Sequence, residues 1–163
     1  MDERFEKIVD IVLGHEGGYV NDSRDPGGET NWGISKRSYP NVNIAILTKK
    51  NATKIYYNDY YLPNKYDKLH AKSALVCFDS AVNSGSKQAN KWLQEAVGAT
   101  PDGVIGPNTL DEYNAYVRAN GEIKVVENIL YNRLIFMSNL AIWPTYKKGW
   151  TRRIISLALE DVS

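Results

Sequence analysis

Residues 71–84, AKSALVCFDSAVNS, are apolar on almost every side when they are wound into a helix. Such a helix is stable only where other elements surround it, so this segment predicts a central, buried helix that ends at Gly85. A chain of 163 residues can bury enough surface to build that cover without disulfides or structural metals. Cys77 lies in the middle of the segment, where we expect a buried and inert thiol.

Apolar residues recur at helical spacing along most of the remaining chain, which predicts a mainly α fold with six or seven helices. The further helices that we expect cover about residues 3–15, 52–61, 89–97, 108–118, 123–139 and, beyond Pro144, a short closing helix near 150–157. We expect one domain over residues 1–163, with a lobe of residues 1–90 and a helical part of residues 91–163. The only candidate boundary is the loop from Gly98 to Pro107.

One segment near the start of the chain breaks the helical pattern. Residues 17–31 contain four Gly, one Pro, two Asn and two Asp, which is the composition of turns. They predict a small irregular or β-hairpin lobe directly after the first helix, with strands at Tyr19–Val20 and from Thr30 to Ile34. Residues 1–40 also carry eight acidic and five basic residues, so the acidic excess of the chain lies around this lobe.

Composition excludes several classes of function. The formal net charge of +1 argues against capture of nucleic acid, which needs a large basic surplus. One Cys and two His leave little for a zinc site, so we expect no metal and no cofactor. No apolar run approaches the roughly 18 residues of a membrane span, and the charged amino terminus is unlike a signal peptide. We therefore expect synthesis in a cytoplasm and release by another component.

The lobe after the first helix gathers carboxylates suited to acid–base catalysis. Glu16 ends the helical pattern, where the negative end of the helix dipole disfavours ionisation and is expected to raise the pKa of a carboxyl group. Asp25, before a Pro-Gly-Gly turn, is the best partner that stays ionised, and the hydroxyl of Thr30 could position a water. Two carboxyls with separated pKa values are the working parts of glycoside hydrolysis. Asp22 and Glu29 compete for the second role.

Simpler interpretations of these carboxylates stay open. Asp before Pro-Gly is common in turns, and a Glu at a helix end is often only solvated. A calcium loop of the EF-hand type that begins at Asn21 would need glycine where Pro26 stands. His15 and Glu16 are not followed by a second His at zincin spacing, so metalloprotease chemistry is unsupported.

The same residues resemble the signature of the glycoside hydrolase family 108 muramidases, which are lysozyme-like endolysins of phages and related bacterial lysis proteins. The resemblance begins with a block of about twenty positions and extends over nearly the whole chain. Its parts are His15 to Asp22, Asp25 to Thr30, Trp32 to Ser35, Phe78-Asp79, Asn83 to Gly85, Trp92 to Gln94, Asp102 to Pro107, Tyr131 to Leu134, Lys148 to Trp150, and Arg152.

This resemblance implies a lysozyme-like fold and cleavage of the β-1,4 bond between N-acetylmuramic acid and N-acetylglucosamine in peptidoglycan. Glu16 matches the proposed general acid of the Glu-Gly-Gly-Tyr motif. The spacing of Glu16, Asp25 and Thr30 also resembles the Glu-Asp-Thr triad of T-even phage lysozymes, in which the second gap is one residue longer. By analogy Tyr19, Trp32 and Asn83 contact the sugar chain.

The resemblance also implies partners and leaves rivals. The glycan strands of peptidoglycan are the expected substrate, a holin is the expected partner for release in a phage, and we expect a monomer that lyses the cell and is antimicrobial. One rival is a lytic transglycosylase, which breaks the same bond with a single Glu. Another is a non-catalytic wall-binding protein, because residues 93–109 resemble a peptidoglycan-binding motif, although they also suit an inter-helix loop. A basic cluster, Lys147, Lys148, Arg152 and Arg153, surrounds Trp150 and could favour encounter with anionic walls.

Overall fold

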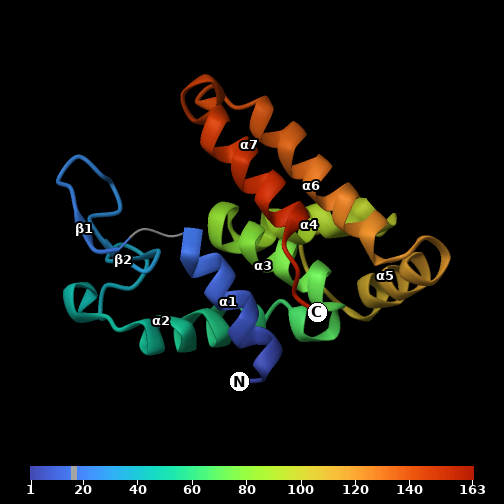
Figure 1. Ribbon diagram of the computed structural model, residues 1–163, viewed down its shortest axis with the longest axis horizontal. Helices are drawn as coiled ribbons and strands as arrows, with labels where there is room; N and C mark the ends of the chain where they lie inside the picture. The colour runs from blue at the N-terminus through green and yellow to red at the C-terminus, as the bar shows by residue number, and fades with distance from the viewer. Residues whose placement is uncertain (16–17) are drawn as a thin grey trace. The chain divides into compact units, whose positions relative to one another are not determined.

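The computed structural model describes residues 1–15 and 18–163, which form two compact units, residues 1–59 and residues 60–163. The described chain contains seven α-helices and one three-stranded antiparallel sheet (Figure 1). The expected mainly α, lysozyme-like fold with a small β lobe after the first helix is confirmed. The assignment of one domain with lobes 1–90 and 91–163 stays a prediction.

The first unit begins with helix α1, Glu3–His15, as the apolar spacing predicts. Asp2 caps it, because its Oδ1 accepts a hydrogen bond of 2.7 Å from the amide of Phe5. The five apolar residues that define the predicted face are all buried: Phe5, Ile8, Val9, Val12 and Leu13. The predicted stop at Gly17-Gly18 involves Gly17, which lies outside the described residues.

The β lobe consists of strands β1, Val20–Asn21, β2, Glu29–Asn31, and β3, Ile34–Ser35, paired antiparallel in that order. Val20 and Ser35 both lie opposite Thr30. The prediction of one strand from Thr30 to Ile34 is wrong, because Trp32 and Gly33 form a turn between β2 and β3. Both have positive φ, 53° and 75°, which suits a two-residue hairpin loop and ends the extended backbone.

Helix α2, Lys49–Tyr56, begins at the N-cap Thr48, whose side chain accepts from the amide of Asn51. It follows the β lobe along the chain (Figure 1), after the 3₁₀ turn η1, Ile44–Ile46. The predicted helix over residues 52–61 is therefore real but begins earlier, and its last turn, Tyr57–Tyr61, is π-helical. This turn contains the division between the two units.

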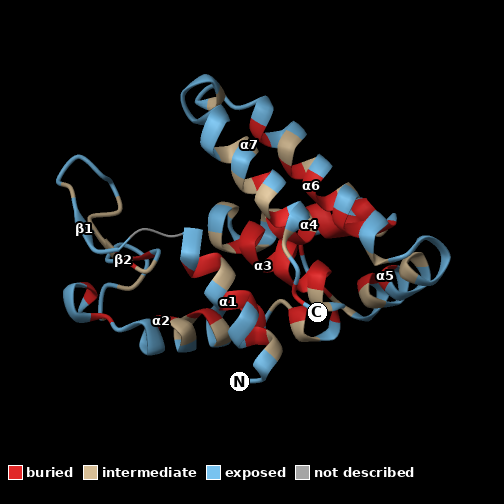
Figure 2. Cartoon of the chain, viewed as in Figure 1, coloured by how far each residue is buried: buried red, intermediate tan, exposed pale blue. Residues whose placement is uncertain are grey.

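The second unit is built around helix α3, Ala71–Ser84, and the prediction of a central buried helix is confirmed. Ten consecutive residues of α3, from Lys72 to Ala81, are buried (Figure 2). Helix α4, Ser86–Val97, follows after the single residue Gly85, and α3 and α4 pack on each other and on α6. The thiol of Cys77 is fully buried, which raises its pKa and keeps it protonated, as expected for an inert side chain.

Three further helices complete this unit: α5, Pro107–Asn120, α6, Glu122–Ser138, and α7, Trp143–Leu159. Helices α6 and α7 pack side by side (Figure 1). The closing helix is longer than the sequence suggested, because Pro144 lies in its first turn, where a missing N–H costs nothing. None of the described helices is long and apolar enough to cross a membrane.

A buried ion cluster joins three helices of the second unit. Asp79 of α3 is fully buried and receives a 2.7 Å hydrogen bond from Arg133 of α6. Arg153 of α7 donates to the other oxygen of the same carboxylate at 2.6 Å from Nη2. Burial by itself would raise the pKa of Asp79, but the two guanidinium charges and their hydrogen bonds lower it overall. The carboxylate is therefore the common partner of two cations and fixes α6 and α7 against α3.

We predict that Asp79→Ala lowers the free energy of unfolding by about 3–5 kcal/mol at pH 7, because it leaves two guanidinium groups without their anion. Since folding lowers the pKa of Asp79, its contribution is complete above its unfolded pKa of about 3.9 and is lost as the pH falls through the folded value. Urea unfolding at pH 7 and at low pH measures both effects. Asp111→Ala on the exposed face of α5 is the matched control, and an equal loss in both variants would contradict the prediction.

Candidate functional site

The catalytic residues expected from the sequence fall around the β lobe of the first unit. Glu16, the expected general acid, lies outside the described residues, one position beyond the end of α1. The structure does describe Asp25, Thr30, Tyr19 and Trp32, and it brings them into a single three-stranded lobe. The lobe therefore begins within a few residues of Glu16 along the chain.

Asp22, which competes for the second catalytic role, is already engaged by a cation. Arg24 donates to its carboxylate from the backbone amide, from Nε and from Nη2, at 2.9, 2.9 and 2.8 Å. These side-chain and backbone hydrogen bonds lower the pKa of Asp22. The pair is exposed and local, so it contributes little to stability, but it covers both oxygens of the carboxylate.

Asp25 is exposed and is oriented by its own turn. Its Oδ1 accepts the amide of Gly27 at 2.8 Å, and its backbone oxygen accepts the amide of Gly28 at 3.0 Å. A Cβ on Gly27 would lie 3.2 Å from Asp25 Oδ1 and 3.7 Å from the Cβ of Ser35. Gly27 thus lies between the carboxylate and Ser35, which is the cross-strand partner of Thr30. The turn brings Asp25 close to the strand pair that carries Thr30.

Glu29 and Thr30 are neighbours in β2 and so project to opposite faces of the sheet. Glu29 accepts a 3.1 Å hydrogen bond from the hydroxyl of Tyr19. Partial desolvation and the hydrogen bond and charge of Glu29 raise the pKa of Tyr19. Thr30 is half-buried between Val20 and Ser35. Of the two, Thr30 is the residue that lies opposite Ser35, next to the turn of Asp25.

Trp32 occupies the left-handed region with φ of 53°, which is unusual for a bulky residue and costs energy. Two hydrogen bonds hold it there. Its indole Nε1 donates to the backbone oxygen of Leu47 at 3.0 Å, and its own backbone oxygen accepts from the hydroxyl of Tyr56 at 2.8 Å. Asn31 adds two bonds from its Nδ2, to the oxygens of Ile44 and Leu47. The half-buried indole is thus fixed by elements outside the sheet.

Asn83, the remaining residue expected to contact sugar, belongs to α3. It is exposed in the last turn of α3, in the second unit, whereas the other candidates belong to the first unit. Among the described residues no group of three or more His, Cys, Asp or Glu side chains is placed to hold a metal ion.

Side chains of the peptidoglycan-binding-like motif, residues 93–109, form hydrogen bonds that hold a loop on α4. Gln94 of α4 is fully buried, and its Nε2 donates to Asp102 at 2.8 Å, to the oxygen of Val104 at 3.0 Å and to Thr109 at 3.1 Å. Its Oε1 accepts the amide of Gly103 at 2.8 Å. The side chains that define the motif are therefore used to hold residues 98–107 on α4, in agreement with the inter-helix loop.

The basic cluster expected around Trp150 is only partly a surface feature. Arg153 points inward to Asp79 and is 13% exposed, so the inclusion of this residue in an exposed cluster is wrong. Lys147, Lys148 and Arg152 are exposed, as predicted. Arg153 faces the core although Arg152 is exposed, because successive residues of a helix are rotated by about 100°.

Sequence reasoning missed three residues that shape the β lobe. Gly27 makes room for the Asp25 carboxylate, and Asn31 and Tyr56 hold the Trp32 turn. The two glycines that follow Pro26 were a sequence signal for the role of Gly27. Nothing in the local sequence marks Tyr56, because its partner lies 24 residues away along the chain.

Comparison with known proteins identifies related chains. The glycosyl hydrolase 108 family model matches residues 9–85, a range that contains every catalytic and sugar-contact residue expected from the sequence. The solved structure of Brucella abortus SagA is similar, with a TM-score of 0.81 and 34% sequence identity over 94% of this chain and 91% of that chain. No curated protein matches the chain.

The loop that carries the binding-like motif gives a test of its structural role. Gly103 has φ of 83°, and a Cβ there would lie 2.7 Å from Lys87 Cγ and 3.0 Å from the Lys87 backbone oxygen. We predict that Gly103→Ala costs about 2–4 kcal/mol of unfolding free energy, measured in urea. Gly98→Ala is the control, since φ there is 76° but no atom lies within 4 Å, and it should cost only about 1 kcal/mol. Equal costs would contradict this role of Gly103.

Proposed function

The chain belongs to glycosyl hydrolase family 108, and we propose that it cleaves the β-1,4 bond between N-acetylmuramic acid and N-acetylglucosamine. Membership makes the chain a glycoside hydrolase that acts on peptidoglycan; the bond and the catalytic residues are our proposal. The observation that carries it is the β lobe beyond residue 16, in which Asp25 is exposed and oriented while Asp22 is covered by Arg24. The non-catalytic alternative is set aside because the family is one of hydrolases.

Glu16 is the proposed general acid. Hydrolysis of a glycosidic bond needs one carboxyl that still holds a proton near neutral pH and passes it to the leaving oxygen. The family motif assigns that role to the Glu before Gly-Gly-Tyr, which is Glu16 in this chain. Protonation breaks the bond to the leaving sugar while positive charge develops on the ring that remains.

Asp25 is the proposed second carboxylate, which stabilises that positive charge or activates the water that attacks it. It is exposed, and the amide of Gly27 fixes the direction of its carboxylate. Thr30, in the neighbouring strand pair, supplies a hydroxyl that can hold the water. Asp22 is a poorer choice, because a substrate would first have to displace Arg24.

Tyr19 and Trp32 are the proposed sugar contacts of the first unit. Tyr19 is 46% exposed and its hydroxyl is oriented by Glu29, so its ring is presented to solvent in a set direction. The strained and doubly held Trp32 fits a position where a fixed aromatic face serves binding. Asn83, in the last turn of α3, is also proposed to contact sugar.

In its biological setting the chain is proposed to act as an endolysin. On this proposal it is made in a cytoplasm, acts as a monomer on the glycan strands of the wall, and in a phage is released by a holin, so that the host cell lyses. The family assignment supports the substrate. The release step and the origin are proposals.

We predict that Glu16→Gln reduces the release of soluble fragments from purified sacculi by at least about 10³-fold, because the proton donor is lost. Asp25→Asn should reduce it by about 10²-fold, and Asp22→Asn by no more than about threefold, since Asp22 is occupied by Arg24. Circular dichroism and urea unfolding check that each variant is folded. If Asp25→Asn kept full activity and Asp22→Asn were inactive, the second catalytic carboxylate would be Asp22 and not Asp25.

The products distinguish hydrolysis from the transglycosylase alternative. A hydrolase adds water across the bond and leaves reducing N-acetylmuramic acid ends, whereas a transglycosylase closes an internal ether and leaves 1,6-anhydro ends. We expect mass spectra of digested sacculi to contain only reducing ends. Predominance of anhydro ends would replace the proposed hydrolysis by the rival reaction.

A further inference from the structure

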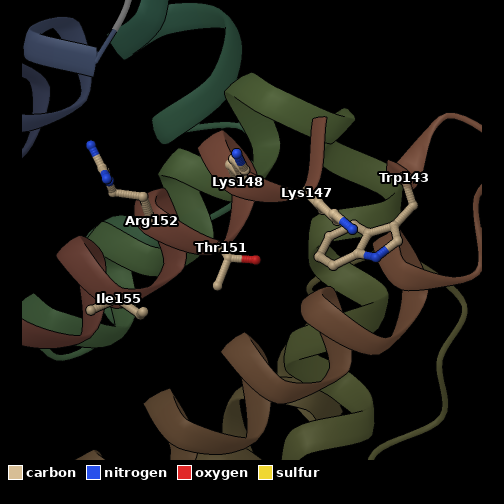
Figure 3. A pocket seen from close by; sticks show the side chains of 6 residues that line it. All are labelled: Trp143, Lys147, Lys148, Thr151, Arg152 and Ile155. Carbon is tan, nitrogen blue, oxygen red and sulfur yellow. The ribbon is translucent and has the colours of Figure 1, made fainter. Parts of the chain in front are cut away.

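Residues Trp143 to Ile155 of α7 line a groove of about 560 Å³ that the proposed catalytic machinery does not use. Figure 3 shows its lining, with Ile155 and Trp143 at opposite ends and Thr151 between them. The other three lining residues are the cations Lys147, Lys148 and Arg152. The groove therefore combines three positive charges with apolar ends.

The charge around this groove is one-sided. Residues 128–159 contain five basic residues and no acidic residue, although the whole chain has a net charge of only +1. Two of the five, Arg133 and Arg153, form ion pairs with the single buried carboxylate of Asp79. The remaining three are those in the groove, and no acidic side chain among the described residues pairs with them.

The stability of the helix does not account for these cations. The amino-terminal end of a helix carries partial positive charge, so acidic residues are favoured near it and basic residues are not. The first turn of α7 has no acidic residue, and Lys147 and Lys148 follow in the next turn. An anionic ligand in the groove would relieve this accumulation of positive charge.

Three aromatic residues of α7, of which Trp143 lines the groove, contact one another beside the cations. The ring of Tyr146 stacks on Trp150, with centroids 5.4 Å apart and planes 17° apart, and Trp143 lies 6.0 Å from Trp150. Tyr146 is 52% exposed and Ile155 is 54% exposed. The three cations favour a ligand with several carboxylates, and Trp143 and Ile155 favour small apolar groups between those carboxylates.

We propose that this groove binds the acidic stem peptides of peptidoglycan, with Lys147, Lys148 and Arg152 on their carboxylates and Trp143 and Ile155 on their alanine methyl groups. The inference rests on the proposed function, because a chain that acts on peptidoglycan meets these peptides on every strand that it cleaves. It adds a recognition site for the peptide to the proposed catalysis on the sugar. The groove would then favour strands that still carry stem peptides.

Binding is tested with the Glu16→Gln variant, which leaves the sacculi undigested, with and without Lys147→Gln, Lys148→Gln and Arg152→Gln. We expect the triple substitution to weaken binding to intact sacculi at least tenfold at low salt, with a smaller loss at high salt because ions screen exposed charges. On glycan strands freed of stem peptides by an amidase, the two proteins should bind alike. The control is the triple substitution of Lys50, Lys54 and Arg118 by Gln, which removes the same charge from exposed positions.

Three results would overturn the proposal. One is undiminished binding of the groove variant to intact sacculi, and another is an equal loss on peptide-free strands. The third is binding to vesicles of phosphatidylglycerol and phosphatidylcholine that depends on the same three cations while binding to sacculi does not, which would make the groove a membrane site. Fragment release by the chain with native Glu16 is measured separately, so a failure of the proposed hydrolysis is distinguished from a failure of the groove.

Discussion

The second unit depends on the buried ion pairs that the carboxylate of Asp79 forms with Arg133 and Arg153. This carboxylate is fully buried on the central helix and takes hydrogen bonds from Arg133 and Arg153, so α3, α6 and α7 share one charged contact. Such a contact costs desolvation, and in the arrangement observed it holds Arg133 and Arg153 turned toward α3. With Arg153 turned inward, Lys147, Lys148 and Arg152 are presented on the outside of α7. The cationic groove is thus a consequence of the core.

Side-chain hydrogen bonds help to order the β lobe of the first unit, together with the buried Ile34, Ile44 and Leu47. Its strands have only two or three residues each, which is too short for independent stability. Asn31, Trp32 and Tyr56 tie it to the backbone that follows, and the amide of Gly27 directs Asp25. The lobe places an exposed carboxylate and a fixed indole close to Glu16 along the chain, at the expense of a strained backbone at Trp32.

Much of the fold followed from local pattern. The buried character of α3 and the start of α1 were predictable, because apolar spacing and turn residues act over a few positions. The break of the strand at Trp32 was not, because it depends on partners at Leu47 and Tyr56. The length of α7 was underestimated because Pro144 marks a helix start as well as an interruption. Within the candidate site, Asp25 was found from its turn, but its advantage over Asp22 depends on the position of Arg24.

By itself the sequence determined the family, the mainly α fold and the set of carboxylates around the β lobe, since a long run of specific residues and the helical periodicity are properties of the chain alone. Only the tertiary structure decided which of those residues are free to act. It assigned Gln94 and Asp102 to holding a loop and Arg153 to the core, and it left Lys147, Lys148 and Arg152 in a groove. The physical reason is that a polar side chain has few hydrogen-bond donors and acceptors. Only the folded structure shows whether other groups of the same chain already occupy them.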